Sequence, residues 1–158
     1  MIAIDFGIRY SFVYNYKVVH HTPQFSMNIG QHNIYLGPQF TQVLHSLGDP
    51  VDVYSKNTYG GNVGYRFHFW KRKSKLVPFA QLDFSIFQLK FNENQLGPPF
   101  LTERKKIVVE NTASIGVDFN PVHHFYIFSG IGFGSYSGFF LLFNSFTPTC
   151  YVGLEYRF

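Results

Sequence analysis

The sequence predicts an all-β protein: one eight-stranded, antiparallel, up-and-down transmembrane β-barrel over residues 1–158. Three observations predict this class: apolar and polar residues alternate with period two, the apolar face lacks charged residues, and the polar face is rich in glycine. Charged residues make up 14% and aromatics 20% of the chain, whereas a soluble domain carries about 25% charged residues. The aromatic content excludes disorder, and no apolar run approaches the ~20 residues of a membrane-spanning helix.

The first segment shows the alternation most clearly. From Ile4 to Tyr16 the even positions are apolar or aromatic, and the odd positions between them include Asp5, Gly7 and Arg9. A helix cannot put these two sets on separate faces, because its side chains recur every 3.6 residues and those of a strand every 2.0. We therefore expect a strand, longer than the ~5–6 residues common in globular sheets.

The same alternation predicts seven further strands. They cover residues 25–29, 34–41, 59–69, 76–86, 107–119, 125–134 and 150–158. Short turns are expected at 30–33, 71–75 and 120–124, and longer connections near 17–23, 45–57, 92–104 and 138–149. Short and long connections alternate, which is typical of a barrel with tight turns at one rim and longer loops at the other.

Two features favour an apolar face that points outward. No Asp, Glu, Lys or Arg occupies the apolar positions, as expected for a lipid-facing surface, where Arg or Lys at mid-depth costs ~2–4 kcal/mol. Glycine on the polar face leaves room for the large side chains of a narrow interior. Ten of the 14 glycines lie there: Gly7, Gly30, Gly37, Gly60, Gly64, Gly116, Gly130, Gly132, Gly134 and Gly153.

Short sequence phrases carry a family resemblance. Residues 34–40 (IYLGPQF) and 77–84 (VPFAQLDF) look most like the Bacteroidetes-type outer-membrane β-barrel domain. The chain as a whole resembles the small eight-stranded outer-membrane barrels of Gram-negative bacteria, the group typified by OmpX and the membrane domain of OmpA. The resemblance implies a bacterial outer-membrane location, short periplasmic turns and longer extracellular loops.

The ends of the chain bear on export. In the families it resembles, a C-terminal strand that ends in Phe is the signal read by the barrel-insertion machinery, and Tyr156 and Phe158 match that pattern. No signal peptide is visible after Met1, since neither a basic region nor a cleavage site follows it. We therefore expect an exported chain in its mature or a truncated form.

The polar face would hold nine ionisable residues inside the barrel. An eight-stranded barrel is just wide enough for side chains to fill it, and an unpaired buried ion costs several kcal/mol. We therefore expect an ion-paired network that plugs the lumen, with a proton or ion path as the alternative. These residues are Asp5, Arg9, Arg66, His68, Asp83, Glu110, Asp118, Glu155 and Arg157.

Three surface segments are candidates for contact with lipid or with a partner. Residues 103–106 suit lipopolysaccharide phosphates at one rim. At the other rim, a basic periplasmic turn suits anionic headgroups, at about 1 kcal/mol per charge, or an acidic partner. That turn contains Lys71, Arg72, Lys73 and Lys75. An apolar cluster is expected to contact a partner or the membrane: Phe139, Phe140, Leu141, Leu142 and Phe143.

Signals for catalysis are weak. His68 has no serine two residues away, and His45, Ser46 and Asp49 are neighbours in one loop. Loop neighbours of this kind rarely form the triad of a nucleophilic enzyme. No catalytic residue is therefore predicted.

Signals for metal binding are also weak. His20–His21 and His123–His124 lack a third ligand at a recognisable spacing, and we expect them to be solvated histidines at opposite rims. The single cysteine, Cys150, excludes an internal disulfide and any multi-cysteine metal site. No metal and no cofactor are predicted.

The sequence thus predicts a non-enzymatic, integral outer-membrane barrel that serves as a structural or accessory subunit, or as a surface interaction module, of a larger assembly. Expected partners are outer-membrane lipid and lipopolysaccharide, the insertion machinery during biogenesis, and other outer-membrane proteins. The net charge of +4 is too small to indicate nucleic acid. The alternatives are an enzyme acting on lipopolysaccharide acyl chains and a soluble, lipocalin-like ligand-binding barrel.

Overall fold

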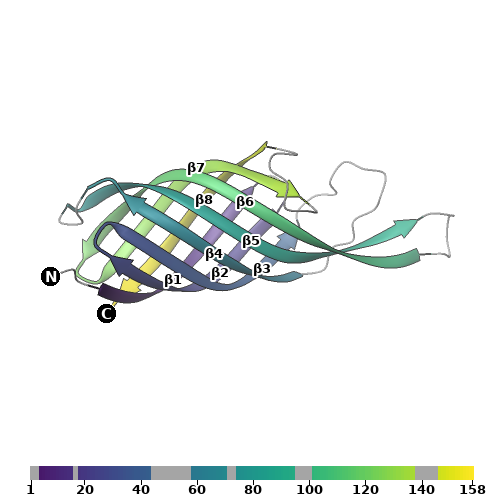
Figure 1. Cartoon of the computed structure of the whole chain (residues 1–158), viewed down its shortest axis with the longest axis horizontal. Coiled ribbons are helices and arrows are strands. Elements are labelled where there is room, and N and C mark those ends of the chain that lie inside the picture. Colours follow the sequence, from purple (N-terminus) through teal and green to yellow (C-terminus); the bar gives the residue numbers. More distant parts are fainter. Residues whose placement is uncertain (1–3, 16–17, 44–57, 71–73, 95–100, 138–145) are drawn as a thin grey trace.

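Eight antiparallel strands close into a barrel in the computed structural model, which confirms the predicted fold class (Figure 1). The strands are β1 (Ile4–Asn15), β2 (Val18–Ile29), β3 (His32–Val43), β4 (Thr58–His68), β5 (Leu76–Asn94), β6 (Leu101–Val122), β7 (Phe125–Ser137) and β8 (Phe146–Arg157). Each pairs with its neighbour in sequence, and β1 pairs with β8. The structure describes residues 4–15, 18–43, 58–70, 74–94, 101–137 and 146–158. Over these residues it contains no helix that could cross a membrane.

The barrel has two unlike rims. Both termini lie at one end, together with the turns between β2 and β3 and between β6 and β7; we call this end the short-turn rim (Figure 1). Gly30 in the first of these turns has φ of 60° and His124 in the second has φ of 73°, in the left-handed region. The opposite strand ends, from Asn15 and Val18 round to Ser137 and Phe146, form the long-loop rim.

The prediction of a long connection at residues 17–23 is wrong. β2 begins at Val18, and Tyr14 pairs with Val19, so only two residues separate β1 from β2. The alternation is obscured in this segment by two histidines and by Pro23. Because proline cannot donate to a ladder, it is tolerated here opposite Pro38, where no β2–β3 pair forms among the described residues.

The predicted connection at 92–104 is also mostly strand. β5 runs to Asn94, β6 starts at Leu101, and these two residues pair. The ladder of β4 on β5 stops at Phe87, and that of β7 on β6 stops at Val109. Residues 88–94 and 101–108 therefore extend as a two-stranded hairpin beyond the barrel (Figure 1), and we call them the hairpin arm.

Apolar side chains face outward and polar side chains face inward, as the alternation predicts. Leu82 and Ile131 on the outer surface are 60% and 66% exposed, whereas Arg66 and His68 in the lumen are 0% exposed. A soluble barrel has the opposite distribution, with apolar side chains in its interior. The lipocalin-like alternative therefore does not fit, and the outer surface is suited to lipid.

Aromatic rings inside the barrel lie opposite glycines on neighbouring strands. The pairs are Tyr35–Gly64, Phe87–Gly60, Phe79–Gly116, Phe128–Gly153 and Tyr151–Gly130. A Cβ added to Gly64 would overlap the Tyr35 ring, and one added to Gly153 would overlap the Phe128 ring. The absence of a side chain on each glycine leaves the space that the ring occupies. This packing explains why glycine is frequent on the polar face.

This close packing predicts that alanine destabilises the barrel at one glycine of β4 and leaves its stability unchanged at another. Gly64→Ala should lower the free energy of unfolding by about 1–3 kcal/mol, because Tyr35 must leave its place. Gly61→Ala is the matched control: a Cβ there approaches only the Gly37 carbonyl, at 4.0 Å. Urea unfolding in lipid vesicles measures both, and equal stability of the two variants would contradict the packing argument.

Candidate functional site

Five fully buried side chains in the middle of the lumen form a layered stack. The Arg9 guanidinium carbon lies 3.8 Å from the Tyr35 ring centre and 4.1 Å from that of Phe128. The Arg66 guanidinium carbon lies 3.7 Å from the Phe79 ring centre and 4.4 Å from that of Phe128. The order is therefore Tyr35, Arg9, Phe128, Arg66, Phe79, which we call the arginine–ring stack.

The stack explains how two guanidinium groups can be buried close together. Desolvated cation–π contacts are worth about 2 kcal/mol or more, and Phe128 provides a face to each arginine. Of the two arginines, Arg9 depends more on ring contacts for its stabilisation in the lumen. Its Nη2 donates to the Gln81 Oε1 at 3.2 Å, but its Nε and Nη1 have no hydrogen-bond partner among the described atoms.

Gln81 joins the stack to the first carboxylate. Its Oε1 accepts hydrogen bonds from Nε and Nη2 of Arg66 at 2.9 and 2.6 Å, besides the one from Arg9. Its amide nitrogen donates to Asp83 Oδ2 at 2.5 Å, and the Tyr35 hydroxyl donates to Oδ1 at 2.7 Å. One amide side chain thus contacts both cations and orients the carboxylate that offsets them.

Asp118 lies toward the short-turn rim and contacts three cationic or protonatable side chains. Its Oδ1 lies 2.5 Å from Arg66 Nη1, and its Oδ2 lies 2.7 Å from His68 Nε2 and 3.6 Å from Arg157 Nη2. All four side chains are buried. Because removing one partner would leave the other charges uncompensated in the lumen, Asp118 is central to the stability of this end of the barrel.

Glu155 completes the ionic part of the lumen. Arg157 binds it in bidentate fashion, with Nε 2.9 Å from Oε1 and Nη2 2.8 Å from Oε2. Three polar side chains also donate to Oε1, at 2.8, 3.2 and 3.2 Å: Ser26, Asn28 and Asn33. Three arginines therefore meet three carboxylates in this part of the lumen: Arg9, Arg66 and Arg157 with Asp83, Asp118 and Glu155.

A second polar cluster lies nearer the long-loop rim, around His20. Its Nε2 lies 2.8 Å from Glu110 Oε2, and its Nδ1 lies 2.8 Å from Thr41 Oγ1 and 3.0 Å from Gln39 Nε2. The prediction that His20–His21 is a solvated rim pair is wrong, because both residues belong to β2. His20 is 2% exposed in the lumen, while His21 is half-buried on the outer side.

The order Thr41, His20, Glu110 has the connectivity of a nucleophilic triad. Its position does not suit catalysis on a lipid, because Thr41 and His20 are 1% and 2% exposed and face the interior. The lumen cavity that His20 and Glu110 line has a free volume of about 20 Å³, room for about one water molecule. A lipid acyl group could not reach this hydroxyl.

The prediction that Asp5 belongs to the lumen network is wrong. It is exposed, whereas the other eight predicted residues line the lumen. The reason is its position in β1: the ladder with β8 begins only at Gly7, so Asp5 has a strand neighbour on one side among the described pairs. Its side chain therefore lies at the open short-turn rim.

Several predicted contact residues lie outside the described part of the chain. They are Lys71, Arg72 and Lys73 of the basic turn, the apolar cluster from Phe139 to Phe143, and the loop histidine His45. Lys75 is described and exposed at the short-turn rim. Tyr156 and Phe158 are 54% and 65% exposed on the outer side of the last strand.

Sequence reasoning missed the apolar members of the site. Phe79 and Phe128 occupy lumen-facing positions, and neither was predicted to belong to the lumen network. A signal was available: an aromatic residue at a polar-phase position, with glycine at the same phase of the neighbouring strand. Among the described residues, no group of three or more His, Cys, Asp or Glu is placed to hold a metal ion.

Comparison with known proteins supports the fold. No protein-family model and no curated protein matches the chain. Among solved structures, it is similar to the N-terminal β-barrel domain of Pseudomonas aeruginosa OprF, with a TM-score of 0.67 at 8% identity over 100% of both chains. It is similar to Neisserial surface protein A, with a TM-score of 0.57 at 9% identity over 98% of this chain and 96% of the other.

A third similar structure is Ail, the attachment invasion locus protein of Yersinia pestis, crystallised with the heparin analogue sucrose octasulfate. Its TM-score is 0.50 at 18% identity, over 99% of this chain and 97% of the other. These likenesses confirm the predicted resemblance at the level of fold. The fold is that of the small eight-stranded outer-membrane barrels, and the outward apolar surface supports a bacterial outer-membrane location.

The stack predicts unequal effects for two phenylalanines of β7. Phe128→Leu should lower the free energy of unfolding by about 2 kcal/mol or more, because both arginines lose a ring face. Phe133→Leu, on the exposed outer face of the same strand, should change it by less than about 0.5 kcal/mol. Urea unfolding in vesicles measures the difference, and equal losses would refute the role of the stack.

The ion pairs predict a similar contrast between two aspartates. Asp118→Asn should destabilise the barrel by about 3–5 kcal/mol, because it leaves Arg66 and Arg157 without their shared carboxylate. Asp5→Asn, at the exposed rim, should leave the midpoint of unfolding unchanged. If Asp118→Asn also left the midpoint unchanged, the lumen charges would have to be solvated rather than paired.

Proposed function

We propose that this protein is a non-enzymatic, non-conducting outer-membrane barrel that serves as an accessory subunit or interaction module of a larger outer-membrane assembly. The observation that carries the proposal is the contrast between a packed lumen and an arm that extends past the barrel. A filled interior leaves the outer surface and the rims as the places where the protein can act.

The packing of the lumen supports the non-conducting part of the proposal. The arginine–ring stack occupies the middle of the barrel, and the cavity beside it has room for about one water molecule. Arg66 and Arg157 are ion-paired with Asp118 and Glu155. An ion crossing the barrel would have to displace paired groups from both clusters.

The hairpin arm supports the interaction part of the proposal. Beyond Phe87 and Val109, the two strands of the arm pair with each other, and the described ladders of β4 and β7 do not continue along them. An unpaired strand edge presents N–H and C=O groups that can accept another strand. The partner best suited to such an edge is an extended polypeptide segment that adds to the sheet.

The rims suggest which side meets which partner. We assign the short-turn rim to the periplasm and the hairpin arm to the cell exterior, as the family resemblance implies. Exposed Lys75 would then face the periplasm with the rest of the basic turn, where it could contact anionic headgroups or an acidic protein. Outer-membrane lipid and the insertion machinery complete the proposed set of partners.

The enzymatic alternative receives no support from the described residues. His68 is buried and bound to Asp118, and the Thr41–His20–Glu110 relay is closed off from lipid. An enzyme acting on acyl chains needs its nucleophile and base at the lipid-facing surface.

Electrical recording tests the non-conducting lumen. The wild-type protein, inserted into a planar bilayer, should give no discrete current steps, because the lumen cavity lined by His20, Gln81 and Glu110 has a free volume of about 20 Å³. Insertion can be verified separately by the fluorescence of Trp70, the single tryptophan, which is 61% exposed at the short-turn rim. Reproducible current steps from inserted protein would overturn this part of the proposal.

Shortening the arm tests the interaction role. Replacing residues 89–106 by Asn-Gly removes most of the arm and keeps the Gln88–Ile107 pair at its base. In gentle detergent extracts of native membranes, we expect the wild type in a particle larger than its own 18.3 kDa, and the shortened variant as a lone barrel. Asp5→Asn, at the opposite rim, is the control that should keep the larger particle. A wild type that migrates alone would contradict the proposal.

A further inference from the structure

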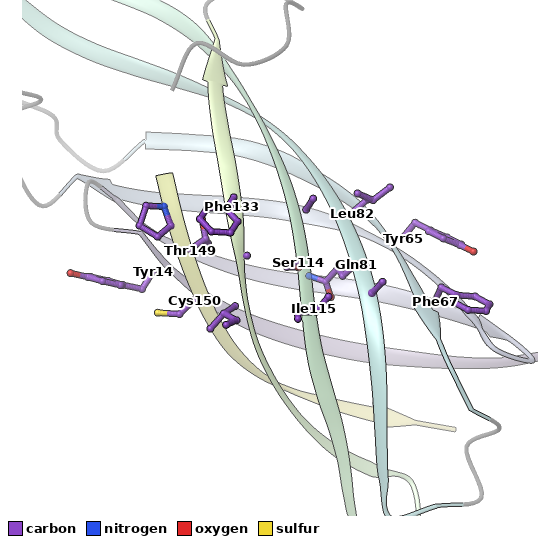
Figure 2. Close-up of a pocket in the computed structure, with 15 residues that line it drawn as sticks. Tyr14, Tyr65, Phe67, Gln81, Leu82, Ser114, Ile115, Phe133, Thr149 and Cys150 are labelled. Carbon is purple, nitrogen blue, oxygen red and sulfur yellow. The ribbon is translucent and has the colours of Figure 1, made fainter. Parts of the chain in front are cut away.

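His68 lies inside the barrel at the point where β4 ends at the short-turn rim. It is fully buried and has the same inward orientation as Arg66, two residues earlier on the strand. Tyr65 and Phe67, which alternate with them, lie on the outer side of β4 (Figure 2). The imidazole ring of His68 is therefore enclosed by the lumen, with its edge 5.9 Å between centroids from the Phe79 ring.

Both ring nitrogens of His68 face hydrogen-bond acceptors. Nε2 lies 2.7 Å from Oδ2 of Asp118, and Nδ1 lies 3.2 Å from the backbone carbonyl oxygen of Gln31. A carbonyl oxygen has no proton to donate. The Asp118 carboxylate also contacts Arg66 and Arg157, which favours its ionised form. A neutral imidazole carries one N–H and an imidazolium carries two, so only the charged ring can donate to both acceptors.

The other buried histidine of the lumen provides a contrast. Nε2 of His20 also lies next to a carboxylate, at 2.8 Å from Oε2 of Glu110. Its Nδ1, however, lies 3.0 Å from the amide nitrogen of Gln39 and 2.8 Å from the hydroxyl of Thr41. Because an amide nitrogen can only donate, Nδ1 of His20 accepts, and this ring carries its single proton on Nε2. Two buried histidines beside carboxylates thus differ in charge.

The charge of the lumen supports this assignment. Apart from the histidines, the ionisable groups that face the lumen in the described strands are three arginines and four carboxylates. They are Arg9, Arg66, Arg157, Asp83, Glu110, Asp118 and Glu155. A buried charge without a counter-charge is costly. One further positive charge makes the lumen neutral, and His68 is the histidine whose two nitrogens both face acceptors.

The charged ring joins three parts of the rim. Gln31 belongs to the turn between β2 and β3, and its carbonyl oxygen also accepts from the backbone N–H of His68 at 2.9 Å. Its side-chain nitrogen donates to the backbone carbonyl oxygens of His68 and Phe69, at 2.9 and 3.3 Å. Through Asp118, the same ring is held to β6. The β2–β3 turn, the end of β4 and the wall of β6 are therefore connected through one side chain.

Loss of one ring proton would break one of these connections. A carboxylate is a stronger acceptor than a backbone carbonyl, so the remaining proton stays on Nε2, next to Asp118. The lone pair of Nδ1 would then face the carbonyl oxygen of Gln31, and that contact would be lost. Around the ring, β4 contributes Arg66, β5 the uncharged Phe79, β6 Asp118, and β8 the ion pair of Arg157 with Glu155.

We propose that His68 is a proton-dependent switch at the short-turn rim. In its charged form it binds Gln31 and Asp118 together, and loss of a proton releases the β2–β3 turn while β4 remains bound to β6. The arginine–ring stack keeps its contacts in both forms, so the switch acts on one rim and leaves the middle of the barrel closed. The proposal goes beyond the accessory role proposed above and does not depend on the hairpin arm or on which rim faces the periplasm.

Nitrogen-15 magnetic resonance of the histidine rings in lipid nanodiscs tests the charge. At pH 7, the wild type should show a proton on both ring nitrogens of His68, and on Nε2 alone for His20. The two residues serve as each other's control, because both are buried in the same lumen. A His68 ring with a single proton at pH 7 would overturn the proposal.

A titration of the same sample to pH 10 tests the switch. When His68 loses its second ring proton, the amide resonances of Gly30 and Gln31 should shift with the same midpoint. His68→Gln should abolish this transition, and His20→Gln, in the other polar cluster, should preserve it. The switch is refuted by a ring that keeps both protons to pH 10, or by turn resonances that do not follow its titration. Both readings come from the wild type and stand even if a variant fails to fold.

Discussion

The structure depends on the burial of two guanidinium groups between three aromatic rings. A closed barrel of eight strands has little interior volume, and its inward side chains must still interlock across the lumen. Phe128 lies between Arg9 and Arg66 and binds both through its faces, which leaves the arginine edges free for Gln81 and Asp118. The rings fit only because the strands opposite them carry glycine.

The filled lumen determines where the protein can act. With the interior occupied by the stack and by two polar clusters, recognition must take place at the rims, on the outer surface or along the hairpin arm. The outer surface itself is differentiated, because small residues on β5 and β6 leave a groove where most of the barrel presents large apolar side chains. On each strand, one set of alternate residues thus packs inside the lumen, and the other set faces the surroundings of the barrel.

The fold and the phase of every strand could be predicted from the sequence, because period-two alternation is a local property of each segment. Strand ends could not: the His20–Pro23 segment lacks a clear pattern, yet its backbone is held by pairing with β1. The arginine–ring stack was also out of reach, because Arg9, Phe128 and Arg66 come from three strands whose relative register is a property of the closed barrel. Asp5 follows the alternation and still misses the lumen, because burial at a rim depends on the neighbouring strand.

Nuclear magnetic resonance of the side chains of Arg9 and Arg66 tests the central claim most directly. If both guanidinium groups lie against ring faces, their Nε–H resonances in lipid nanodiscs should be shifted upfield and exchange slowly with water. Phe128→Leu should move both resonances together, because one ring serves both. Resonances at the positions of solvated arginine, with fast exchange, would contradict the account, since the lumen would then be hydrated rather than packed.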